Sequence, residues 1–148
     1  MMKTNLNWNE KMRFTADCDG NTVMMDAKAP LGENKAMTPK ELVATGLGGC
    51  TAMDVIALLK KHKQDYKSLQ VEVGITSSSG GHPVIFTEAN LLFRVTGSVD
   101  KTILLESVKL SQTKFCGVSA MLSKALPIRY QVLLNDEEIG SGQADFNS

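Results

Sequence analysis

One long apolar helical segment constrains the fold of this 148-residue chain more than any other feature. Thr38, Pro39 and Glu41 predict its start, because threonine can cap a helix, proline suits the first helical position, and a glutamate three residues after the cap closes a capping box. The basic residues 60–63 suit the negative end of the helix dipole, so the helix should run to about Lys63. A helix that is apolar on most faces must be covered on all sides, and in so small a chain a second subunit can supply part of the cover. The apolar residues are Leu42, Val43, Leu47, Met53, Val55, Ile56, Leu58 and Leu59.

The same segment is apolar enough to raise the question of a membrane span. Asp54 lies inside it, and Thr45, Thr51 and three glycines dilute its hydrophobicity. A charged residue in mid-span is costly in lipid. The sequence therefore favours a buried helix of a soluble protein and predicts no membrane partner.

The net charge and the N-terminal residues indicate which partners and which cellular location to expect. Lysine plus arginine and aspartate plus glutamate each number 16, so the formal net charge is zero. Nucleic acid binding needs a net basic face, so no nucleic acid partner is expected. Residues 1–13 are polar and charged without an apolar run, which predicts no signal peptide and a cytoplasmic location.

The other segments predict a single α+β domain over residues 1–148, because strands and helices do not alternate regularly. Asp-Gly and Gly-Asn pairs predict a turn over residues 17–21. The expected order is β-hairpin, long central helix, antiparallel strands, two further helices and a final strand. The expected elements are strands 12–16 and 22–25, a loop over 27–36, strands 69–75 and 84–95, helices 101–114 and 117–124, strand 128–134, and a possible short strand from residue 137.

Two cysteines in small-residue contexts are the candidate chemical groups. Cys50 follows the run Gly46-Leu47-Gly48-Gly49 inside the long helix. Glycines weaken a helix, so these indicate close approach by a partner helix, a substrate or another backbone, with tight helix–sheet packing as the plainer alternative. Cys116 opens the run Cys116-Gly117-Val118-Ser119 between two predicted helices. A free cysteine is most often a small buried apolar residue.

If the fold brings Cys50 and Cys116 together, the two thiols can reduce a hydroperoxide. A thiolate attacks a hydroperoxide to leave a sulfenic acid, a second thiol condenses with it to a disulfide, and an external dithiol resets the pair. Asp54 lies one helical turn beyond Cys50, where a carboxylate would disfavour a thiolate, so we interpret it as a hydrogen-bonded structural residue. Cys18 falls in the predicted hairpin turn and is expected to be a bystander. The sequence contains no CxxC, HxxxH or HxxE pattern of metal ligands, so no metal site is expected.

Two motifs resemble those of one family. The run Pro39-Lys40-Glu41-Leu42-Val43-Ala44-Thr45-Gly46-Leu47-Gly48-Gly49-Cys50-Thr51 resembles the central-helix motif of the OsmC/Ohr family, and Cys116-Gly117-Val118-Ser119 resembles its second motif. The Leu-Gly-Gly-Cys-Thr string is most similar to the OsmC-like branch. The resemblance covers nearly the whole chain in the order of its elements.

The resemblance implies an intertwined homodimer with two sites at the subunit interface. It implies that Cys50 is the peroxidatic residue and Cys116 the resolving one. The implied reaction is reduction of organic hydroperoxides in oxidative stress defence, with no bound cofactor and an external dithiol of the lipoyl type as reductant. Another apolar electrophile is a further possible substrate. The alternative is a non-catalytic protein that binds an apolar or lipid-like small molecule in the same pocket.

The chain departs from the family pattern at one pair of residues. In the peroxidases that it resembles, a glutamate directly follows the proline of the helix motif and pairs with an arginine near the catalytic sulfur. Here Lys40 follows Pro39, and Glu41 comes one place later, which rotates its side chain by roughly 100° around the helix. Glu41 is thus a possible supporting residue. No arginine lies in the predicted hairpin turn, where the family places its arginine; Arg13 precedes that turn, inside the predicted strand, and matches the family position poorly.

Overall fold

The computed structural model of the chain describes residues 1–147 and contains two compact units, Met1–Val43 and Ala44–Ser148. The sequence-based prediction of a single domain stays a prediction. The α+β class is confirmed, with two sheets, a long helix and further helical segments.

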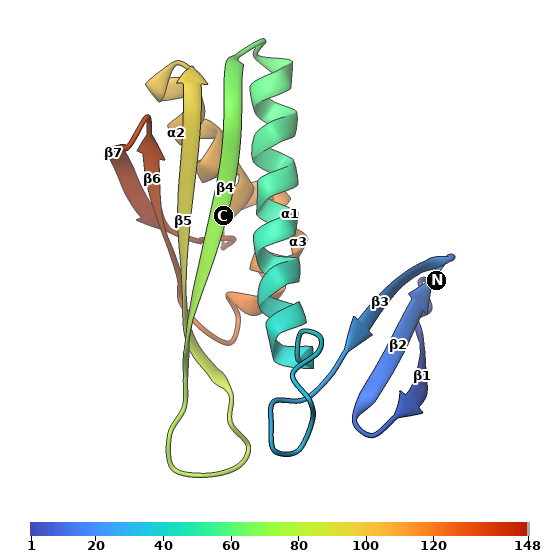
Figure 1. Ribbon diagram of the computed structural model, residues 1–148. Helices are drawn as coiled ribbons and strands as arrows, with labels where there is room; N and C mark the ends of the chain where they lie inside the picture. Colours follow the sequence, from blue (N-terminus) through green and yellow to red (C-terminus); the bar gives the residue numbers. More distant parts are fainter. Residues whose placement is uncertain (148) are drawn as a thin grey trace. The chain divides into compact units, whose positions relative to one another are not determined.

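The first unit holds a three-stranded antiparallel sheet in the order β1-β2-β3 (Figure 1). The predicted hairpin is confirmed, with Asp19 and Gly20 at positive φ in its turn. Cys18 lies at the end of a strand, opposite Asn21, and not in the turn as expected. The first strand was not predicted, because it contains three asparagines, which are depleted in strands. The strands are β1 (Asn5–Glu10), β2 (Arg13–Cys18) and β3 (Asn21–Met25).

The long helix α1 spans Pro39–Lys61 and begins where its capping residues predict. The Thr38 backbone N–H donates to Glu41 Oε2 at 2.8 Å, and the Glu41 N–H donates to Thr38 Oγ1 at 3.2 Å. This reciprocal pair confirms the capping box. The helix ends two residues before the expected Lys63, which has positive φ.

The second unit holds a four-stranded sheet in the order β4-β5-β6-β7. The predicted hairpin of β4 and β5 is confirmed, although both strands are longer than expected. Strand β6 pairs parallel to β5, and the possible strand after residue 137 is present as β7. The strands are β4 (Asp65–Ser77), β5 (Phe86–Ser98), β6 (Ile128–Leu134) and β7 (Glu137–Gln143).

A helical segment that connects β5 to β6 carries the second cysteine. It consists of α2 (Lys101–Leu110), a π-helical turn η1 (Ser111–Phe115) and α3 (Gly117–Leu122). The predicted helix over 101–114 is therefore interrupted. The Cys116 N–H donates to the Ser111 carbonyl, five residues back, at 2.9 Å, so Cys116 lies at the break between η1 and α3.

The core of the second unit lies between its helices and one face of the sheet. Alternate residues of β5, Leu91, Phe93 and Val95, are buried, as the strand pattern predicts. Helix α1 runs alongside β4 in Figure 1. A Cβ placed on Gly48 would lie 2.8 Å from Val73 Cγ2 of β4, so this glycine permits close helix–sheet packing. The helices contribute Leu47, Val55, Leu59, Leu104 and Val108 to the same cluster.

Helix α1 is also the one helix, within the part of the chain that the structure describes, that is long and apolar enough to cross a membrane. Leu47, Val55 and Leu59 of this helix are completely buried in the core cluster. A core helix of a globular protein passes the same test of length and composition.

Candidate functional site

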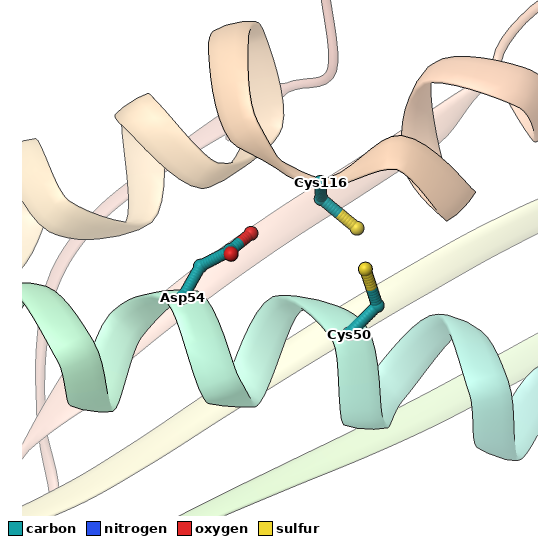
Figure 2. Close-up of side chains that lie close together, drawn as sticks. All are labelled: Cys50, Asp54 and Cys116. Carbon is teal, nitrogen blue, oxygen red and sulfur yellow. The ribbon is translucent and has the colours of Figure 1, made fainter.

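Cys50, Asp54 and Cys116 converge on one point of the second unit. Cys50 and Asp54 project from the same face of α1, one turn apart, and Cys116 projects toward them from the break between η1 and α3 (Figure 2). The two sulfur atoms and a carboxylate oxygen all lie within 4.8 Å of one another. The structure thus brings together the two cysteines that the sequence singles out, from segments far apart in the chain.

The two thiols differ in exposure. Cys116 is completely buried, whereas Cys50 is half-buried. Burial raises the pKa of the Cys116 thiol to about 11, and the nearby Cys50 adds to the rise. Ser119 acts in the opposite direction, since its backbone N–H donates to Cys116 Sγ at 3.3 Å. Cys116 is therefore a protonated thiol in neutral solution, and Cys50 is the thiol within easier reach of a solute.

A chain of hydrogen bonds ends on Asp54 and holds its carboxylate near the sulfurs. Ser111 Oγ donates to Asp54 Oδ2 at 2.9 Å, and Thr51 Oγ1 lies 2.7 Å from Ser111 Oγ. Gln112 Nε2 donates to Thr51 Oγ1 at 2.9 Å. Because the Ser111 proton is directed to the carboxylate, the Thr51 hydroxyl must donate to Ser111, which fixes the direction of the whole chain.

This arrangement confirms the hydrogen-bonded role expected for Asp54 and adds three residues that sequence reasoning missed. Thr51, Ser111 and Gln112 are all buried polar residues. Ser111 and Gln112 are neighbours in the chain, and both lie in the π-helical turn η1. The sequence offers only weak signals for them: Thr51 directly follows Cys50, and Ser111 and Gln112 open a run of four polar residues that ends two positions before Cys116.

The remaining candidates belong to the first unit. Glu41 completes the capping box and forms an ion pair with Lys28 at 2.9 Å. Arg13 pairs with Glu10 and lies 3.6 Å from Glu33. Cys18 is half-buried in β2.

The architecture is an α+β fold that places one cysteine on a long core helix and a second at a helix break. Residues 32–131 match the sequence profile described as OsmC-like protein. Protein YhfA of Escherichia coli strain K12 is 35% identical over 132 residues, which cover 87% of this chain and 95% of YhfA. The chain belongs to the OsmC-like family, as its two motifs led us to expect.

Solved structures of this family share the fold. An OsmC-like protein from Mycoplasma pneumoniae superposes with a TM-score of 0.79 at 19% identity, covering 90% of this chain and 96% of that one. The organic hydroperoxide resistance protein OhrB of Bacillus subtilis superposes with a TM-score of 0.64 at 13% identity, covering 90% of this chain and 98% of OhrB. These likenesses establish the fold.

Proposed function

We propose that this protein is a thiol-dependent peroxidase that reduces organic hydroperoxides through Cys50 and Cys116. The observation that carries the proposal is the approach of the two sulfurs to within 4.8 Å of each other on a family fold in which hydroperoxide resistance proteins occur. A disulfide needs the sulfurs to approach to about 2.05 Å. From within 4.8 Å, the two sulfurs have at most about 2.8 Å to close.

Cys50 is the attacking residue in this proposal, because it is the more exposed of the two thiols. Its sulfur attacks the outer oxygen of the hydroperoxide, the O–O bond breaks, and the products are a sulfenic acid on Cys50 and an alcohol. The proton of the thiol ends on the alkoxide that leaves.

Asp54 carries that proton from the Cys50 sulfur to the oxygen of the leaving alkoxide in our mechanism. Its carboxylate is held near Cys50 by the Ser111 hydroxyl, and one carboxylate oxygen reaches both sulfurs within 4.8 Å. A carboxylate can accept the thiol proton during attack and return it to the leaving alkoxide, which is general base followed by general acid catalysis. This role differs from the stabilising charge that an arginine supplies in the peroxidases that the chain resembles.

Cys116 then resolves the intermediate. Its buried thiol remains protonated and unreactive toward solutes until the sulfenic acid forms beside it. Condensation forms the disulfide and releases water. An external dithiol of the lipoyl type restores both thiols by two exchange steps and becomes a cyclic disulfide itself.

A single-turnover experiment tests the assignment of roles. One equivalent of cumene hydroperoxide is added to reduced protein, and the intact mass is measured. The native protein should lose two hydrogens, Cys116→Ser should gain one oxygen that dimedone traps on Cys50, and Cys50→Ser should remain unmodified. Rapid oxidation of Cys50→Ser at Cys116 would contradict the proposed roles.

We propose that the active form is a homodimer. We also propose that the protein acts in the cytoplasm. In the first unit, Leu6, Trp8 and Val23 share one face of the sheet, because Leu6 pairs with Ala16 and Ala16 pairs with Val23. Their side chains are 52%, 63% and 44% exposed, so this face presents an apolar surface to solvent.

The second unit has an apolar surface of its own on α1. Met53 is 75% exposed and lies in an open groove of about 600 Å³ between α1 and β4. In our proposal, a second copy of the chain packs against both apolar surfaces, as the all-round apolar character of α1 predicts. Sedimentation velocity should give a dimer for the native protein and a monomer for Trp8→Glu or Met53→Glu. A native protein that sediments as a monomer at high concentration would contradict the homodimer.

A further inference from the structure

Three potential metal ligands meet at the site, and two of them are thiols. Cys50 Sγ, Cys116 Sγ and an Asp54 carboxylate oxygen lie within 4.8 Å of one another. Sulfur and carboxylate ligands at about 2.3 and 2.0–2.2 Å from a tetrahedral zinc ion would be separated by about 3.5–3.8 Å. The separations therefore exceed the spacing that such an ion requires by no more than about 1.3 Å.

We propose that the reduced site binds one Zn²⁺ ion per chain through Cys50, Asp54 and Cys116, with a water molecule as fourth ligand. Two thiolates select a soft or borderline cation such as Zn²⁺ over Mg²⁺ or Ca²⁺, which prefer sites made of oxygen ligands alone. The ion would enter from the side of Cys50 and Asp54, because both are half-buried while Cys116 is completely buried.

Groups around the site already orient the ligands in the way that metal sites require. The Ser111 hydroxyl donates to one oxygen of Asp54, which leaves the other oxygen for a cation. The Ser119 N–H points at Cys116 Sγ at 3.3 Å and would stabilise the sulfur as a thiolate once the metal has displaced the proton. The ligands come from α1 and from the break before α3, so no short sequence motif discloses them.

A bound ion would compete with the peroxide reaction. It would hold both sulfurs, so Cys50 could not attack a hydroperoxide until the ion left. This consequence rests on the proposed peroxidase function, whereas metal binding itself does not, and the two are tested separately.

Titration of the reduced, metal-free protein with Co²⁺ provides the test, because Co²⁺ reports its ligands through its absorption spectrum. We expect one Co²⁺ per chain, with intense thiolate-to-metal absorption and the visible bands of a tetrahedral ion, and displacement of Co²⁺ by one equivalent of Zn²⁺. Cys50→Ser and Cys116→Ser should each lose most of the thiolate absorption. Asp54→Asn should raise the dissociation constant at least about tenfold.

Cys18→Ser is the matched control, since it removes a cysteine that lies in the first unit, and it should bind Co²⁺ like the native protein. Circular dichroism of each variant would establish that it is folded. Binding that survives both Cys50→Ser and Cys116→Ser would overturn the proposal, as would an octahedral spectrum without thiolate absorption. The titration contains no hydroperoxide, so a protein without peroxidase activity can still pass it, and an active peroxidase can fail it.

Discussion

The difference between the two site thiols gives a quantitative prediction about Cys116. In the variant that carries both Cys18→Ser and Cys50→Ser, Cys116 is the one thiol left. Burial, the largest cause of its raised pKa, persists in this variant. Loss of Cys50 removes a smaller contribution that also raises the pKa, so the native pKa of about 11 is an upper bound for the variant, and at this bound roughly 0.1% of the thiol is ionised at pH 8. An unfolded thiol with a pKa of about 8.5 is ionised to roughly 24% at the same pH.

The thiolate is the reactive form, so ionisation alone should slow alkylation in the folded protein by up to about 240-fold relative to the unfolded protein. The assay is the rate of iodoacetamide labelling at pH 8, measured by mass for the same variant in buffer and in guanidinium chloride. Denaturant effects on the reagent are removed by parallel labelling of a small thiol. Folded and unfolded rates that agree within tenfold would refute the reasoning, because they would mean that the Cys116 thiol is neither desolvated nor protected.

Two further predictions concern stability. Because the folded pKa of Cys116 lies above the unfolded value, its contribution to stability is present below about pH 8.5 and is lost as the pH rises toward 11. The free energy of unfolding should therefore fall with pH by up to about 1.4 kcal/mol per unit in this range, and Cys116→Ser should lack this component in chemical denaturation. Gly48→Ala should destabilise the protein by about 1 kcal/mol, because overpacking against Val73 outweighs the gain in helix propensity. Val73→Ala in the same chain should make Gly48→Ala favourable, and additive effects in this double-mutant cycle would contradict the contact.

Local signals in the sequence predicted most of the elements. The capping residues Thr38 and Glu41 fixed the start of α1, because both hydrogen bonds of a capping box form between near neighbours in the chain. The alternation of Leu91, Phe93 and Val95 predicted the buried face of β5 in the same way.

Features that depend on distant segments were not predictable to the same degree. The parallel pairing of β6 with β5 depends on the path of the intervening helical segment. The π-helical turn that contains Ser111 and Gln112 departs from the helical period on which the prediction rested. Both misses reflect tertiary packing that outweighs local preference.

The site was predictable only in part, because one of its contacts is local and the others join distant segments of the chain. Cys50 and Asp54 lie four residues apart on one helix, so their shared face follows from the sequence. The meeting of Cys50 with Cys116 depends on tertiary structure, and the sequence supported it only through the resemblance of two motifs to one family. The hydrogen bonds from Ser111 to Asp54 and between Ser111 and Thr51 could be found only in the folded chain.

The most direct test of the peroxidase proposal is multiple turnover of cumene hydroperoxide by the purified protein with dihydrolipoamide as reductant. Peroxide consumption is followed for the native protein, Cys50→Ser and Cys18→Ser after removal of metal ions by a chelator. We predict many turnovers per chain for the native protein and for Cys18→Ser, and none for Cys50→Ser. A folded, metal-free native protein that consumes no more peroxide than Cys50→Ser would contradict the proposal and favour a non-catalytic role in binding apolar small molecules.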